Sequence, residues 1–206
     1  MSLWALVPVK PLRRGKSRLK EVLTEKERTD LNINMLINIV KILSEIPELS
    51  NVLIVSRDPK ALSVAREYGA RTVQEDGNPD LNIALTRATL IAQSSSAKGV
   101  FILPADLPLI TKEDIYTMIS HADDPPVVVI NPDHKGTGTN ALIVNPAGLL
   151  NYEFGINSFQ KHTAQAKEKG INLKICDLPS IALDIDEPED LSLLNGFEFA
   201  HKEALS

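Results

Sequence analysis

The stretch Gly99-Val100-Phe101-Ile102-Leu103-Pro104-Ala105-Asp106-Leu107-Pro108 combines the most apolar strand predicted in the chain with a carboxylate that follows it directly. Residues 99–103 show no alternation of apolar and polar side chains, so the strand is expected to be buried on both faces of a sheet. Such strands belong to α/β folds, in which helices cover both faces. Ligands of these folds lie beyond the carboxyl ends of the strands, where Asp106 stands.

Other short apolar runs alternate with helical patterns along the chain. Strands are expected at residues 3–9, 52–55, 71–74, 99–103, 127–130, 141–144 and 173–176, with a further short extended piece at 181–185. Helices are expected at residues 25–46, 59–69, 79–94, 157–169 and 188–194, with another that begins at 111. This alternation predicts a single α/β domain over residues 1–206, a three-layer α/β/α arrangement with a mostly parallel, mixed sheet and a loose tail after about residue 196.

Polar residues mark the starts of two of these helices. Thr24 and Glu27 have the spacing of a capping box, in which each side chain bonds the backbone N–H of the other residue. Thr111 precedes Glu113 and Asp114, whose negative charges suit a helix N-terminus. These patterns place two helix boundaries from the sequence alone.

Charge and hydropathy exclude several classes of function. The chain has 206 residues, with 22 Lys and Arg against 27 Asp and Glu, and a formal net charge of −5. That balance argues against a partner that is nucleic acid or an anionic membrane, since such proteins usually carry a basic excess. No run approaches the roughly 18 apolar residues of a membrane helix, and residues 3–9 are expected to form a buried strand rather than a signal peptide. A cytoplasmic protein is the expectation.

The cysteine and histidines offer no metal centre or nucleophilic pair. Cys176 is the single cysteine, which excludes an intramolecular disulfide and a cysteine-based zinc cluster, and it is expected to be a small core thiol. The four histidines show no metal-ligand spacing and are expected on the surface. They are His121, His134, His162 and His201.

One segment after the first predicted strand is strongly basic. Residues 10–20 contain no acid, so all 27 acidic side chains lie elsewhere. Such a loop either is a solvated surface segment or holds a small polyphosphate, and its place at a strand end favours the phosphate. Gly15-Lys16-Ser17 does not complete a P-loop, because that pattern needs a glycine where Lys10 stands. The basic side chains are Lys10, Arg13, Arg14, Lys16, Arg18 and Lys20.

Three carboxylates are candidate metal ligands. Asp106 either binds Mg²⁺, a cation that prefers oxygen ligands, or is a turn residue. Asp184 and Asp186 are two apart in an extended segment, so their side chains point to the same face and repel unless a cation or a proton lies between them. A binding module without catalysis has no need for the three to converge. Separations above about 10 Å, against metal–oxygen distances of roughly 2.1 Å, would argue against catalysis.

Two glycine-bearing segments could form an anion pocket at the same edge. Residues 135–140 (KGTGTN) offer glycines that allow close backbone approach, and hydroxyl and amide side chains beside them. In residues 154–159 (FGINSF), Asn157 or Ser158 is expected to cap a helix whose N–H groups can receive an anion. Residues 74–82 form a polar loop that is as consistent with a plain connection as with ligand contact.

In this order, the segments resemble the 2-phospho-L-lactate guanylyltransferase family, which has a nucleotide-diphospho-sugar-transferase-like (glycosyltransferase-A-like) fold. The resemblance covers residues 1–195. Its motifs are Val7-Pro8-Val9-Lys10, Lys16-Ser17-Arg18-Leu19, Asp80-Leu81-Asn82-Ile83-Ala84-Leu85, Pro104-Ala105-Asp106-Leu107-Pro108, Gly136-Thr137-Gly138-Thr139-Asn140, Phe154-Gly155, Ser158-Phe159 and Leu183-Asp184-Ile185-Asp186.

The resemblance implies an enzyme that moves GMP from GTP to 2-phospho-L-lactate or phosphoenolpyruvate, releases pyrophosphate and serves coenzyme F-420 synthesis. By the same resemblance, Mg²⁺ would bind Asp106, Asp184 and Asp186, and the acceptor would bind Thr139, Gly155 and Ser158. Lys10, Lys16 and Arg18 would face the nucleotide phosphates, and Asn82 would lie near the base or ribose. A homodimer is the working expectation for the assembly.

Two alternatives remain open on the sequence. One is another nucleotidyltransferase of this fold, acting on a sugar phosphate or on molybdopterin. The first loop of those relatives is rich in glycine, and the loop that follows residue 9 is not. The other is a nucleotide-binding module without catalytic activity.

Overall fold

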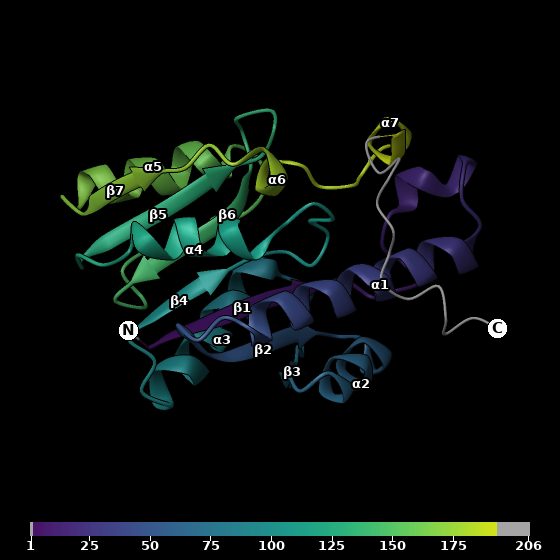
Figure 1. Ribbon diagram of the computed structural model, residues 1–206, viewed down its shortest axis with the longest axis horizontal. Helices are drawn as coiled ribbons and strands as arrows, with labels where there is room; N and C mark the ends of the chain where they lie inside the picture. Colours follow the sequence, from purple (N-terminus) through teal and green to yellow (C-terminus); the bar gives the residue numbers. More distant parts are fainter. Residues whose placement is uncertain (1, 193–206) are drawn as a thin grey trace.

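A computed structural model describes residues 2–192 and contains a seven-stranded sheet over that range (Figure 1). The order across the sheet is β3-β2-β1-β4-β6-β5-β7, and only β6 runs antiparallel to its neighbours. The predicted mostly parallel, mixed sheet is confirmed. The strands are β1 (Leu3–Val9), β2 (Leu49–Ser56), β3 (Arg71–Gln74), β4 (Gly99–Ile102), β5 (Val127–Pro132), β6 (Thr139–Asn145) and β7 (Asn172–Ile175).

Helices cover both faces of this sheet, as the three-layer prediction requires. One face packs against α1 (Glu25–Ser44), α2 (Pro59–Glu67) and α4 (Lys112–Ser120). The other packs against α3 (Leu81–Ser94) and α5 (Ser158–Glu168). Three short helices complete the described chain, namely the 3-10 helix η1 (Ser17–Glu21), α6 (Pro179–Ala182) and α7 (Pro188–Ser192).

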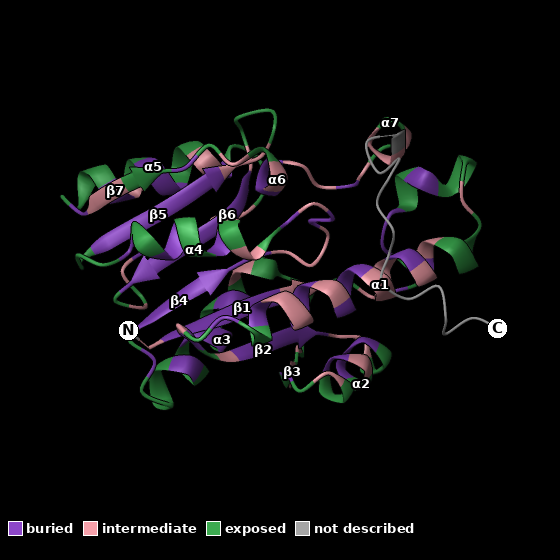
Figure 2. Cartoon of the chain, in the orientation of Figure 1, coloured by how far each residue is buried: buried purple, intermediate pink, exposed green. Residues whose placement is uncertain are grey.

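Burial of the strands on both faces explains their lack of alternation. In β1, Ala5 and Val7 belong to the apolar core beneath α1, whereas Trp4 and Leu6 belong to the core beneath α3. In β4, Phe101 likewise belongs to the core beneath α1 and Ile102 to the core beneath α3. Strands β4 and β6 are therefore buried along their length, and β1 is buried up to Val7, as Figure 2 shows.

Local sequence signals fix the helix starts where a side chain satisfies a free backbone N–H. The predicted capping box of Thr24 and Glu27 is confirmed, and Thr111 forms a second one with Asp114. Asn157 precedes α5 but makes no capping bond through its side chain, and Ser158 is already the first helical residue. The prediction that one of these two side chains caps α5 is therefore wrong.

Residues 181–185 do not form the predicted short extended piece. Pro179 starts the single turn α6 instead, because its fixed φ suits a first helical position. The chain becomes extended only at Leu183. The predicted loose tail after residue 196 and the end of the predicted helix 188–194 lie outside the described residues. Within residues 2–192, no helix is both long and apolar enough to cross a membrane.

The reversed strand β6 matters for the site. Because β6 runs against β4 and β5, its first residues, Thr139 and Asn140, lie at the sheet edge where β4 and β5 end. Residues after β4 and residues at the start of β6 therefore meet at one edge.

Candidate active site

A cavity of about 940 Å³ opens beyond the carboxyl ends of β1 and β4. Its lining comes from the loops after β1, β2, β3 and β4 on one side, and from residues 133–140, 154–158 and 184–186 on the other. The predicted site residues in the lining are Lys10, Lys16, Arg18, Asp106, Thr139, Gly155, Ser158, Asp184 and Asp186.

Three carboxylates converge in this cavity. One oxygen from each of Asp106, Asp184 and Asp186 lies within 4.8 Å of the others. Asp106 follows β4, and its backbone carbonyl accepts a hydrogen bond from the N–H of Ile185. The Ile185 side chain is fully buried with Leu19 in a small apolar cluster, so the carboxylates on either side of it face the cavity. The separation falls well inside the 10 Å limit set above.

Burial and mutual repulsion raise the energy of negative charge at this cluster. The pKa of Asp184 is raised, first by burial and then by the charges of Asp106 and Asp186. The hydrogen bond from Asn140 Nδ2, at 3.4 Å, and the charge of Lys16 act in the opposite direction. A set of crowded carboxylate oxygens suits a hard divalent cation such as Mg²⁺.

Lys16 is the basic residue that touches this cluster most closely. Its Nζ lies 2.6 Å from Asp106 Oδ2 and 3.2 Å from Asp186 Oδ1, and its side chain is 4% exposed. Burial, the largest single influence, lowers the pKa of Lys16, but the charges and hydrogen bonds of Asp106 and Asp186 together raise it above the usual value. Lys16 is therefore a buried ammonium group inside the cavity wall.

The backbone before Lys16 is held against α1. Asn32 of α1 donates from Nδ2 to the carbonyl of Leu12 at 2.8 Å. A Cβ on Gly15 would come within 2.7 Å of the same Nδ2, so glycine permits this close approach. Lys16 follows with a left-handed φ of 57° and directs the chain into η1. The basic loop is thus fixed in place, which fits a loop that positions charge.

The other basic residues of the loop divide into two groups. Arg18 lines the cavity, with Nη1 3.7 Å from Asp186 Oδ2 and 3.4 Å from Glu187 Oε1, while Lys10 lies at the end of β1. Arg13, Arg14 and Lys20 are exposed and are not part of the lining. Half of the basic cluster therefore faces the cavity.

The glycine-bearing segments lie on the opposite wall. Asp133 Oδ1 accepts from the N–H of Thr137 at 2.8 Å, and the Thr137 carbonyl accepts from the N–H of Phe159 at 3.1 Å. These bonds join the turn before β6 to the start of α5. Gly155 has a φ of 126°, a conformation that favours glycine, and Ser158 is buried beside it.

Asn82 has a different environment from the other predicted site residues. Its Oδ1 accepts from the N–H of Phe154 at 2.7 Å, and its Nδ2 donates to the Phe154 carbonyl at 3.2 Å. The side chain thus connects α3 to the loop before α5 and does not line the cavity. Its predicted contact with base or ribose stays a prediction that these bonds do not favour.

His162 is a residue that sequence reasoning missed. The prediction that it is a surface histidine is wrong, because it is fully buried. His121 and His134 are exposed as predicted, and His201 lies outside the described residues. The available signal was helical spacing, since His162 lies four residues after Ser158 and shares its buried face of α5.

Both ring nitrogens of His162 have partners. Nδ1 lies 3.1 Å from Thr139 Oγ1, and Nε2 lies 3.1 Å from the backbone nitrogen of Glu153. Burial lowers the pKa of His162 to about 4, an effect that the charge of Lys161 reinforces and that of Glu153 opposes. The imidazole is therefore neutral at pH 7.

This burial predicts an acid-dependent loss of stability. An unfolded histidine titrates near pH 6.5, whereas folded His162 titrates near 4, so between these values the unfolded chain binds more protons. The contribution of neutral, buried His162 to the free energy of unfolding is fully present above about pH 6.5. It falls by about 3 kcal/mol as the pH approaches 4. We expect the unfolding free energy of the unmodified protein, minus that of His162→Gln, to shrink by this amount between pH 7 and pH 4. Urea unfolding at each pH measures it, and a constant difference contradicts the assignment.

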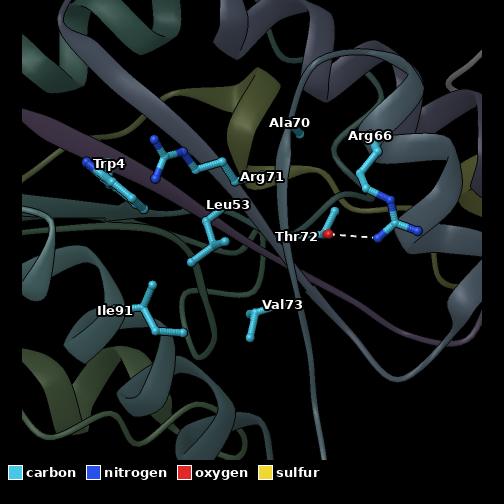
Figure 3. Close-up of a pocket in the computed structure, with 8 residues that line it drawn as sticks. All are labelled: Trp4, Leu53, Arg66, Ala70, Arg71, Thr72, Val73 and Ile91. Atoms are coloured by element: carbon cyan, nitrogen blue, oxygen red, sulfur yellow. Dashed lines mark hydrogen bonds between the residues drawn. The ribbon is translucent and has the colours of Figure 1, made fainter.

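A second hollow, of about 390 Å³, lies beside the edge strand β3 (Figure 3). Arg66 donates to Thr72 Oγ1 at 2.9 Å, and the Arg71 guanidinium lies 5.1 Å from the centroid of the Trp4 ring. No carboxylate lines this hollow, so it offers no metal ligands. Its residues are Trp4, Leu53, Arg66, Ala70, Arg71, Thr72, Val73 and Ile91.

Comparison with known proteins gives matches over nearly the whole chain. Residues 3–203 match the family described as "Guanylyl transferase CofC like". The chain is 41% identical over 194 residues to the phosphoenolpyruvate guanylyltransferase of Rubrobacter xylanophilus, with 94% of each chain covered. It is 33% identical to the 2-phospho-L-lactate guanylyltransferase of Methanothermobacter thermautotrophicus, with 93% of this chain and 83% of that protein covered.

Solved structures agree on the fold. A nucleotidyl transferase from Methanothermobacter thermautotrophicus superposes with a TM-score of 0.67 at 14% identity, covering 94% of this chain and 96% of the other. A CMP:2-keto-3-deoxy-manno-octonic acid synthetase complexed with CTP gives a TM-score of 0.65 at 13% identity, covering 95% and 98%. The predicted glycosyltransferase-A-like architecture is confirmed.

Proposed function

The chain belongs to the family of guanylyl transferases like CofC, and from this membership we propose that it transfers GMP from GTP to the phosphate of phosphoenolpyruvate. It is thus a nucleotidyltransferase. The observation that carries the choice of acceptor is the 41% identity to a phosphoenolpyruvate guanylyltransferase over 94% of both chains. The product is expected to serve the synthesis of coenzyme F-420, and a homodimer stays a prediction.

The two walls of the cavity support this assignment. The wall after β1 and β4 carries Lys16 and Arg18 and suits the triphosphate of a nucleotide. The wall formed by residues 133–140 and 154–158 offers hydroxyl groups and a glycine backbone, and suits a smaller anion. The three carboxylates lie between them. Two anionic substrates can therefore approach each other across this cluster.

The reaction needs positioning and charge neutralisation rather than a protein nucleophile. An acceptor phosphate oxygen forms a bond to the α-phosphorus of GTP, and the bond from that phosphorus to the oxygen bridging to the β-phosphate breaks, so pyrophosphate leaves. Lys16 holds a buried positive charge beside the cluster, and Arg18 adds a second at the cavity mouth. Both oppose the repulsion between the two anions.

The carboxylates suit a bound Mg²⁺ on chemical grounds. Asp106, Asp184 and Asp186 each present an oxygen to one region, and the pKa of Asp184 is raised by its burial and by the negative charges of the other two. A Mg²⁺ ion held by these residues would supply neutralisation of phosphate charge and polarisation of the phosphorus under attack. Thr139, Gly155 and Ser158 on the opposite wall would bind the acceptor.

An assay of pyrophosphate release tests the proposal. GTP, ATP and CTP are each combined with phosphoenolpyruvate and 2-phospho-L-lactate in the presence of Mg²⁺. We expect the fastest release from GTP with phosphoenolpyruvate, and loss of release on addition of EDTA that excess Mg²⁺ reverses. A glucose 1-phosphate arm tests the sugar-phosphate alternative. Absence of release with every pair, together with retained GTP binding, would favour a binding module over an enzyme.

A further inference from the structure

A chain of hydrogen bonds runs from the backbone of Glu153 through His162 to Thr139. The N–H of Glu153 points to Nε2 of His162 at 3.1 Å, and Nδ1 of the same ring lies 3.1 Å from Thr139 Oγ1. His162 is fully buried and Thr139 is 8% exposed, yet Thr139 forms part of the cavity lining. The chain therefore connects the interior of the protein to the cavity.

The donor and acceptor in each of these hydrogen bonds follow from the bond to the Glu153 backbone. A backbone N–H can only donate, so Nε2 of His162 must accept and carries no proton. In a neutral imidazole the other nitrogen then carries the hydrogen, so Nδ1–H donates to Thr139 Oγ1. The neutral state agrees with the lowered pKa of His162.

This direction determines what Thr139 can do. Its hydroxyl oxygen accepts from His162, which leaves the hydroxyl proton for an acceptor elsewhere. Its side chain has no other hydrogen-bond partner within the described residues, and the residue borders the cavity. A phosphate or carboxylate oxygen in the cavity offers such an acceptor.

We propose that His162 is a positioning residue that fixes the Thr139 hydroxyl as a hydrogen-bond donor to the anionic acceptor substrate. This rests on the proposed function for the identity of the acceptor. His162 itself does not line the cavity and acts through Thr139. The ring thereby prepares the hydroxyl before substrate arrives, so binding requires less reorganisation.

The direction of the bond can be measured on the free protein. Long-range ¹H–¹⁵N NMR at pH 7 is expected to show His162 as the neutral tautomer with its proton on Nδ1. A proton on Nε2, or an imidazolium ring, would overturn the proposal. Because no substrate is present, this result does not depend on the proposed function.

Two amide substitutions separate positioning from packing. In His162→Asn, the side-chain amide reaches the place of Nδ1 and can still donate to Thr139. In His162→Gln, the amide reaches the place of Nε2 and can still accept from Glu153, but Thr139 loses its donor. We expect His162→Gln to raise the KM for phosphoenolpyruvate about tenfold or more, and His162→Asn to raise it less than about threefold. The KM for GTP should stay within about twofold in both variants.

Thr139→Val removes the hydroxyl and should raise the same KM about tenfold or more. The double variant Thr139→Val/His162→Gln should be no worse than Thr139→Val alone, because both changes remove one interaction. His121→Gln, at an exposed histidine, controls for substitution as such. Equal effects of Asn and Gln at position 162, parallel losses for GTP, or independent effects in the double variant would each overturn the proposal. Lack of transfer by the unmodified protein would contradict the proposed function. The NMR measurement of the His162 tautomer would still test the hydrogen bond from His162 to Thr139.

Discussion

Replacement of Asp106 or Asp184 by asparagine is expected to lower GTP-dependent pyrophosphate release by about a thousandfold, because a cation held at this cluster would supply several kcal/mol of transition-state stabilisation. Asparagine has nearly the same shape but removes one of the three negative charges. At Asp184 the change also relieves the burial and repulsion that raise the pKa of this carboxyl. Its fold should therefore remain intact, with an unfolding temperature equal to or above that of the unmodified protein.

The measurement combines pyrophosphate release with thermal unfolding of the same preparations. Asp123→Asn is the matched control, because Asp123 is an exposed carboxylate outside the cavity. Isothermal titration with Mn²⁺ should show weaker cation binding in Asp106→Asn and Asp184→Asn, and unchanged binding in the control. Near-normal turnover in both cavity variants would exclude the assigned metal site.

Lys16→Met is expected to lower kcat by about a hundredfold to a thousandfold, because it removes a preorganised positive charge from a buried site. The Lys16 ammonium contacts Asp106 and Asp186. Without it, these carboxylates are free for an added cation. We therefore expect Mn²⁺ to bind more tightly to the nucleotide-free variant even as turnover falls.

Opposite changes in turnover and cation affinity distinguish this role from general damage to the site. Lys20→Met serves as the control, because Lys20 belongs to the same basic loop but is exposed and does not line the cavity. It should retain both properties. A Lys16→Met variant with full activity would show that the lysine only balances the charge of the carboxylates.

Features of the fold that depend on neighbours in sequence could be predicted. The capping box at Thr24 needs only Glu27, three residues later, and the structure contains it. The apolar run 99–103 predicted a strand buried on both faces, and β4 is buried throughout. The capping prediction at Asn157 failed because this residue adopts a left-handed conformation, which depends on the loop around it.

The contacts within the site could not be derived from sequence spacing. Lys16 meets Asp106 across 90 residues and Asp186 across 170, and only the order of strands in the sheet brings them together. Strand ends and the spacing of 184 and 186 already made these residues candidates, and resemblance to a family gave their roles, but neither gave the bonds between them. Asn82 illustrates this. Its side-chain amide bonds the backbone of Phe154, 72 residues away, instead of lining the cavity.

His162 shows why polarity alone is a poor guide to burial. A histidine with two hydrogen-bond partners can be buried as a neutral ring, but those partners, Thr139 and Glu153, belong to other segments. The sequence spacing indicates which face of α5 carries His162, but it does not indicate which residues bond its ring.

Because of the order of strands, the two walls of the cavity come from different parts of the polypeptide. One wall comes from residues 8–106 and the other from residues 133–158, with Asp184 and Asp186 closing the join beside Asp106. On the proposed function, the residues that would contact the acceptor, Thr139, Gly155 and Ser158, therefore belong to one continuous stretch of the chain. We expect a chimera that takes residues 111–182 from a relative to acquire that relative's acceptor preference and to keep its own choice of nucleotide. If so, the preferences for acceptor and for nucleotide would be open to change by separate mutations, in different parts of the chain.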